Sequence, residues 1–60
     1  MLIWEYMGHC IHEAGRCIAL AELMSTRGNR EKTAFHLRKA QEWMDRAAVA
    51  LRAEAEGRES

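Results

Sequence analysis

A cluster of basic and hydroxyl residues near the middle of the chain is the best candidate for chemistry. Asn29 is followed by Arg30, Glu31, Lys32 and Thr33, at the point where a helical pattern begins. The first backbone N–H groups of a helix attract phosphate because they lack intrahelical partners. An arginine adds a bidentate fork and a lysine adds a point charge. Arg30, Lys32 and Thr33 are therefore predicted to bind a small anion.

Aromatic side chains provide surfaces on which a nucleobase could stack. Trp4 and Tyr6 lie near the start of the chain, where burial is hardest, and Phe35 and Trp43 lie in its second half. Aromatic planes bind bases in this way in single-stranded nucleic acid recognition. We interpret Trp4 and Tyr6 as candidate ligand contacts. Packing between subunits is the alternative, and it is the main interpretation for Trp43.

Histidine, cysteine and glutamate are crowded in the first third of the chain without completing a metal or catalytic motif. His12-Glu13 begins like the HExxH helix of zinc proteases, but Arg16 stands where the second histidine is required. A structural zinc site needs four ligands. A metal-binding protein that uses His9, His12 and Glu13 stays an alternative. We predict no metal, no cofactor and no enzymatic activity, because no nucleophile and base converge in the pattern.

Two helices are predicted to position these residues. The first covers about residues 2–24, a loop covers 25–29, and the second covers about 30–54, with a frayed tail over 55–60. In the loop, Gly28 suits the left-handed position after a helix and Asn29 suits an N-cap. Small or apolar residues recur along the first helix at alternating spacings of four and three: Ile3, Met7, Cys10, Ala14, Cys17, Ala21 and Met24.

The second helix carries a coiled-coil-like row of its own, which is predicted to face a partner helix. This row consists of Ala34, Leu37, Met44, Ala48 and Leu51, with Gln41 at its one position that is not apolar. The first helix also has a second apolar row, formed by Ile11, Ile18 and Leu23 with Leu20 beside it.

A helix with two apolar stripes must bury more than one side. A chain of 60 residues buries only about 60% of its unfolded surface, so its own core is marginal. We therefore expect one all-α domain over residues 1–60, an antiparallel two-helix hairpin. It is expected to pack side by side with other copies in a homo-oligomer, as a dimer or a higher ring-like assembly.

Charge and composition limit the partners. Nine basic and nine acidic residues balance to a net charge of zero, which argues against duplex nucleic acid. No apolar run approaches the roughly 20 residues that span a bilayer, and no signal peptide is recognisable, so no membrane partner is expected. Cys10 and Cys17 stand about 10.5 Å apart along a helix, too far for a disulfide. Two reduced thiols favour a cytoplasmic location.

Two blocks of the sequence resemble the short helical-hairpin domain shared by phage anti-CBASS and anti-Thoeris "sponge" proteins. The first block, His12–Ala19 (HEAGRCIA), is similar to a pattern of His-Glu-Ala-Gly-basic followed by small and apolar residues. The second block, Arg30–Thr33 (REKT), is similar to an Arg-Glu-x-Ser/Thr helix start. Matching positions continue along the second helix at Ala34, Leu37, Ala40, Trp43, Met44 and Ala47.

The resemblance implies a function that spacing does not give. Such domains form oligomers, including hexamers, that bind cyclic di- and trinucleotides between subunits without cleaving them. The ligand is thereby withheld from a bacterial immune effector, in the host bacterial cytoplasm if the protein is phage-encoded. Arg30 and Thr33 stand at the positions where the family contacts its ligand, and Arg16 matches a basic position on the first helix. His36 and Arg38 depart from the family, which has more apolar residues there.

The alternative is a helical oligomerisation or protein-interaction module that binds no small molecule. In that case Arg30, Lys32 and Thr33 would tolerate substitution. Side chains of the predicted helix contacts, such as Ala14, Leu37 and Met44, would not.

Overall fold

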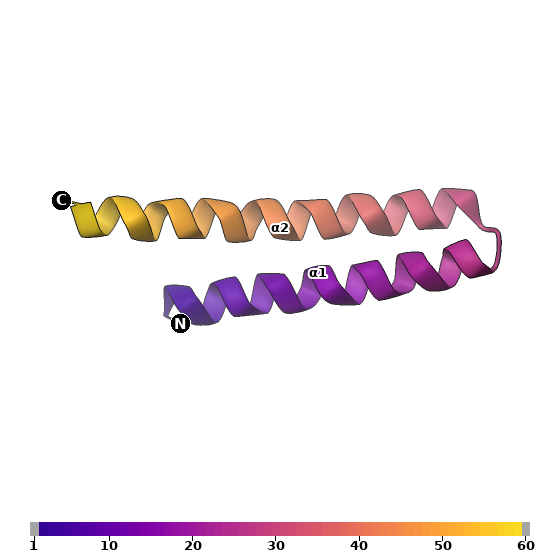
Figure 1. Cartoon of the computed structure of the whole chain (residues 1–60), viewed down its shortest axis with the longest axis horizontal. Coiled ribbons are helices and arrows are strands. Elements are labelled where there is room, and N and C mark those ends of the chain that lie inside the picture. The colour runs from indigo at the N-terminus through magenta and orange to yellow at the C-terminus, as the bar shows by residue number, and fades with distance from the viewer. Residues whose placement is uncertain (1, 60) are drawn as a thin grey trace.

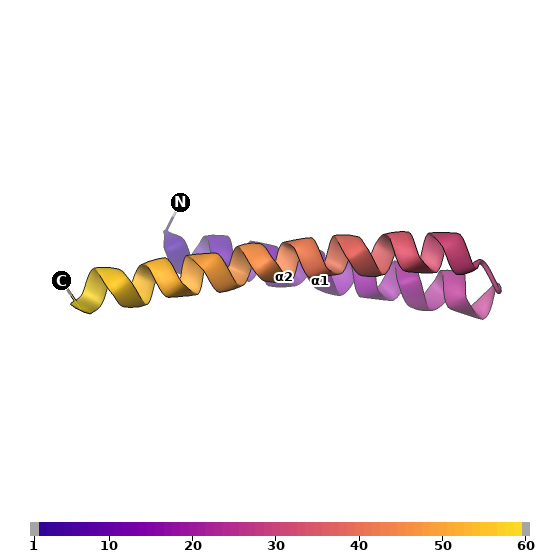
Figure 2. The same ribbon diagram turned by 90° about the horizontal axis from the view of Figure 1, so that it is seen from above.

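The protein is a hairpin of two long helices, which a computed structural model describes for residues 2–59 (Figure 1). Helix α1 spans Ile3–Thr26 and helix α2 spans Arg30–Glu59. The helices run antiparallel and overlap along most of their length in both views (Figure 2), in a body of 49 × 15 × 12 Å. The part of the chain that the structure describes contains no strand. The all-helical, two-helix prediction is confirmed.

The turn between the helices is fixed by local hydrogen bonds. Gly28 has a φ of 73°, the left-handed conformation that glycine adopts without a Cβ penalty. The Asn29 N–H donates to the Met24 carbonyl at 2.9 Å, which closes the end of α1. The Asn29 side-chain oxygen accepts from the Lys32 N–H at 3.0 Å, as an N-cap does. The predicted roles of Gly28 and Asn29 are both confirmed.

The Asn29 cap gives a first testable prediction. Asn29→Ala should lower the free energy of unfolding by about 1 kcal/mol, because the Lys32 N–H loses its acceptor. Asn29→Asp keeps an oxygen in the same place and should retain the stability. Thermal unfolding at matched protein concentration, followed by circular dichroism, measures both. An unchanged melting temperature for Asn29→Ala would contradict the capping role.

The contact between the helices uses the predicted row of α1. Met7, Cys10, Ala14 and Ala21 are buried, and the other members of this row are half-buried. The row of α2 that meets it alternates spacings of three and four: Thr33, His36, Ala40, Trp43, Ala47, Ala50 and Glu54, of which the three alanines are buried. We call these two facing rows the seam.

The predicted contact row of α2 does not lie in the seam. Leu37, Met44 and Leu51 are 51%, 47% and 51% exposed, so their assignment as contacts with the first helix is wrong. Alanines hold the buried positions of the seam on α2 instead, and Thr33, His36, Trp43 and Glu54 are half-buried between them. Leu37, Met44 and Leu51 are then left on the outer surface of α2.

Helix α2 continues beyond the expected end near residue 54. Glu54 and Arg58 form an ion pair of 2.6 Å one turn apart, and the Arg58 guanidinium lies 5.8 Å from the centre of the Trp4 ring. Ala53 and Ala55 favour the helix, and a cation in its last turn is favourable for the helix dipole. Helix α1 likewise runs to Thr26. Met1 and Ser60, the ends of the predicted domain, lie outside the described residues.

Candidate anion-binding site

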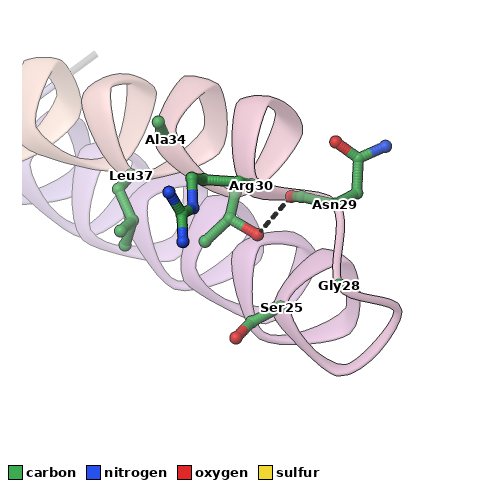
Figure 3. Close-up of a pocket in the computed structure, with 7 residues that line it drawn as sticks. Ser25, Gly28, Asn29, Arg30, Ala34 and Leu37 are labelled. Atoms are coloured by element: carbon green, nitrogen blue, oxygen red, sulfur yellow. Dashed lines mark hydrogen bonds between the residues drawn. The ribbon is translucent and has the colours of Figure 1, made fainter.

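A hollow at the turn end of the hairpin contains the best-placed cation of the predicted site (Figure 3). It has a volume of about 390 Å³ and is open to solvent. That volume is at the low end of the roughly 300–1,000 Å³ of small-molecule sites. Its lining comes from the end of α1, the connecting loop and the first two turns of α2: Ser25, Gly28, Asn29, Arg30, Thr33, Ala34 and Leu37.

Part of the donor capacity of this helix start is already used within the protein. The Thr33 hydroxyl donates to the Asn29 carbonyl at 2.7 Å (dashed in Figure 3), and the Lys32 N–H is capped by Asn29. The N–H groups of Arg30 and Glu31, at the first two helical positions, have no intrahelical acceptor. An anion in the hollow could therefore bind to the Arg30 guanidinium and to these N–H groups. Thr33 offers mainly hydroxyl lone pairs in this arrangement.

Lys32 and Arg16 do not line this hollow. Lys32 stands seven positions before Lys39 and fourteen before Arg46, so it belongs to their row on another side of α2. Arg16, midway along α1, forms an exposed ion pair of 3.5 Å with Glu13. Of the four predicted polar residues, the structure brings together Arg30 and Thr33.

The predicted aromatic contacts lie at the opposite end of the hairpin. Trp4 is 21 residues before Ser25 on the same helix, which is roughly 30 Å of helix rise. Trp4 and Tyr6 also differ in their neighbours, because Trp4 lies under Arg58 and Tyr6 lines a second hollow with Arg46. One hairpin therefore cannot bring either ring to Arg30.

The second hollow, of about 400 Å³, includes residues that the sequence analysis did not single out. The Arg46 guanidinium lies 4.5 Å from the centre of the Trp43 ring, and the His9 ring meets Trp43 edge-on at 5.5 Å. A hydrogen bond with Cys10 raises the pKa of the Tyr6 hydroxyl above its ordinary value. The lining is formed by Ile3, Tyr6, Asp45, Arg46, Val49 and Ala50.

The thiols and histidines form no larger site. Cys10 is buried and Cys17 is half-buried, and both are free, so the prediction that they form no bridge is confirmed. Among residues 2–59, no group of three or more His, Cys, Asp or Glu side chains is arranged to hold a metal ion. Neither helix, over the residues described, has the length and apolar character needed to cross a membrane.

Comparisons with protein-family models, with curated proteins and with solved structures found no match to this chain. The resemblance to the sponge domain therefore stays a prediction.

Proposed function

We propose that this chain forms a homo-oligomer, between a dimer and a hexamer, that sequesters a cyclic di- or trinucleotide without cleaving it. The observation that carries the proposal is the position of Arg30. It lines an open hollow together with Leu37, which heads the row of exposed apolar side chains on α2. A subunit that covers those side chains would also close the open side of the hollow.

The chemistry of the hollow suits part of a cyclic nucleotide. Arg30 can bind a phosphate with two parallel hydrogen bonds, and the N–H groups of the helix start add further donors. Ala34 and Leu37 provide apolar contact for a ribose or a base edge. A base-stacking ring has to come from another subunit, since Trp4 and Tyr6 of the same chain lie at the far end. Lys32 and Arg16 are the further candidates to reach such a ligand from a neighbouring hairpin.

Binding without cleavage fits the residues that line the hollow. The lining residues include no carboxylate, imidazole or thiol. General acid–base catalysis or nucleophilic attack on a phosphodiester would need such a group within hydrogen-bond reach. The hollow offers positive charge, N–H donors, the hydroxyls of Ser25 and Thr33, and apolar contact surface.

Arg30→Ala should weaken binding of the cyclic nucleotide roughly 10- to 150-fold, as expected when a charge-assisted hydrogen bond of about 1.5–3 kcal/mol is lost. Arg38→Ala is the matched control, because it removes the same charge from an exposed position of α2 that does not line the hollow. Isothermal titration calorimetry with a panel of cyclic di- and trinucleotides measures both variants. Equal affinity of the wild type and a folded, oligomeric Arg30→Ala variant would refute the site.

The exposed apolar row of α2 also favours a second candidate, an oligomerisation or protein-interaction module with no small ligand. Native mass spectrometry of the protein, alone and with the same panel, separates the two. A defined oligomer that gains the mass of a nucleotide supports the sponge proposal. A defined oligomer that takes up none of the panel supports the second candidate.

A further inference from the structure

The two sides of the hairpin that flank the seam differ in character. On one side, each helix has a row of large apolar residues. The row of α1 directly follows the seam residues Ile3, Cys10 and Cys17, and the row of α2 directly follows His36, Trp43 and Ala50. These two rows lie on the same side of the antiparallel pair. Two observations support this: Ser25 and Leu37 line one hollow at the turn end, and Arg58 covers Trp4 at the other end. We call this the apolar side, formed by Trp4, Ile11 and Ile18 of α1 and Leu37, Met44 and Leu51 of α2.

The apolar side is large and uncharged. Its six side chains are between 47% and 57% exposed, and no charged residue lies in their two rows between Trp4 and Ile18 or between Leu37 and Leu51. The opposite side also exposes apolar side chains, among them Tyr6, Leu20 and Val49. It differs in carrying Lys39 and Arg46, and these cations already contact Phe35 and Trp43 of the same chain. Contiguous exposed apolar surface of this kind marks an interaction site on a protein.

We propose that the apolar side binds the apolar side of a second copy of this chain, with the two hairpins antiparallel. The inference rests on the self-assembly proposed above and deepens it by naming the surface and the orientation. The outline of the whole hairpin, 49 × 15 Å, is on the order of 700 Å², and the six apolar side chains cover about 21 Å of its length. An interface of the usual roughly 800 Å² per partner would therefore also include the small and polar residues that flank them. A symmetric pair buries both apolar sides and leaves neither open.

Charge favours the antiparallel orientation. The turn end, residues 25–32, has three cations and one carboxylate, whereas the open end, residues 2–6 and 54–58, has three carboxylates and one cation. In an antiparallel pair each turn end lies against the open end of the other copy, and the positive and negative net charges of the two ends attract. Arg30 then faces Arg58 of the second copy, whose guanidinium is already paired with Glu54 of its own chain. A parallel pair would place like ends together.

Small residues leave room for close contact. Gly8 and Gly15 lie in the row of α1 beside the apolar side, and a Cβ added at either would meet nothing within 4 Å. Ala34 and Ala48 hold the equivalent row of α2. The row of α1 runs from Trp4 to Ser25, and its midpoint is near Gly15. The row of α2 runs from Arg30 to Arg58, and its midpoint is Met44. The two-fold axis therefore passes there, Met44 meets Met44 of the second copy, and Leu37 meets Leu51 of the second copy.

Cysteine cross-linking tests the surface and the orientation together. The background is Cys17→Ala, with Cys10 retained because it is 0% exposed. With a short bis-maleimide, Met44→Cys should yield a covalent dimer by itself. Leu37→Cys and Leu51→Cys should each stay at the mass of one chain, and a mixture of the two should yield the dimer. Val49→Cys, which is exposed on the opposite side, is the control and should stay single.

Other outcomes overturn the inference in distinguishable ways. A covalent dimer of Leu37→Cys alone would show a parallel pair. Dimers of Val49→Cys without dimers of Met44→Cys would place the interface on the other side. A chain that sediments as a monomer would refute self-association itself. Cross-links at the expected positions in a protein that binds no cyclic nucleotide would keep this inference and refute the ligand proposed above.

Discussion

Met44→Lys should leave the hairpin folded and separate the proposed antiparallel dimer into single chains. Met44 is 47% exposed in the hairpin, so a lysine is tolerated there by the fold itself. In the antiparallel pair, however, two lysines would meet near the two-fold axis without a counter-charge. Burying unpaired charge costs several kcal/mol, and a loss of about 4 kcal/mol weakens association about 1,000-fold.

Val49→Lys is the matched control for this experiment. Val49 is 56% exposed on the opposite side of α2, so the same charge is added to the same helix outside the apolar side. Sedimentation velocity over a range of concentrations measures association, and circular dichroism confirms that both variants are helical. If Val49→Lys dissociates the oligomer while Met44→Lys does not, the apolar side is not the interface.

Ala14→Leu should destabilise the hairpin itself. Ala14 is 1% exposed and lies in the seam, where buried alanines of α2 face it. The added side chain has no space unless the helices separate, and overpacking of this kind costs about 1–3 kcal/mol. In a chain whose own core is marginal, such a loss unfolds a large share of the molecules.

The control for Ala14→Leu is Ala19→Leu, the same substitution at an exposed position of α1. Surface substitutions of this kind usually change stability by less than about 0.5 kcal/mol. Urea unfolding followed by circular dichroism gives both free energies. Equal stability of the two variants would show that the alanine seam is not tightly packed.

The seam of α1 was predictable from sequence and that of α2 was not, for a physical reason. In α1 the seam contains Ile3, Met7 and Met24 among smaller residues, so its period stands out. In α2 the buried residues of the seam are Ala40, Ala47 and Ala50. The stronger apolar signal comes from Leu37, Met44 and Leu51, which directly follow the seam residues His36, Trp43 and Ala50. Hydrophobic periodicity finds the most apolar stripe. It does not tell whether that stripe faces the other helix of the hairpin or a surface outside it.

Some features of the candidate site could be predicted from the sequence and others could not. Gly28, Asn29 and Arg30 could be placed from sequence because helix caps depend on neighbours within a few residues. The contact of Arg46 with Trp43 has a local signal, a cation three positions after an aromatic residue on a helix, that could have been used. The positions of Trp4 and Tyr6 relative to Arg30 could not be predicted, because one hairpin holds them at opposite ends.

The three-residue connection from Arg27 to Asn29 has a consequence for the order of events after synthesis. One short loop brings the whole length of the two helices together, and local topologies of this kind fold in about microseconds to milliseconds. Encounter between two chains at micromolar concentration takes roughly 0.1–10 s at ordinary association rates. In the proposed assembly each chain therefore becomes a hairpin first and pairs with a second chain later. How soon the proposed binding capacity appears is then governed by the amount of protein made, because the pairing step depends on concentration and the folding step does not.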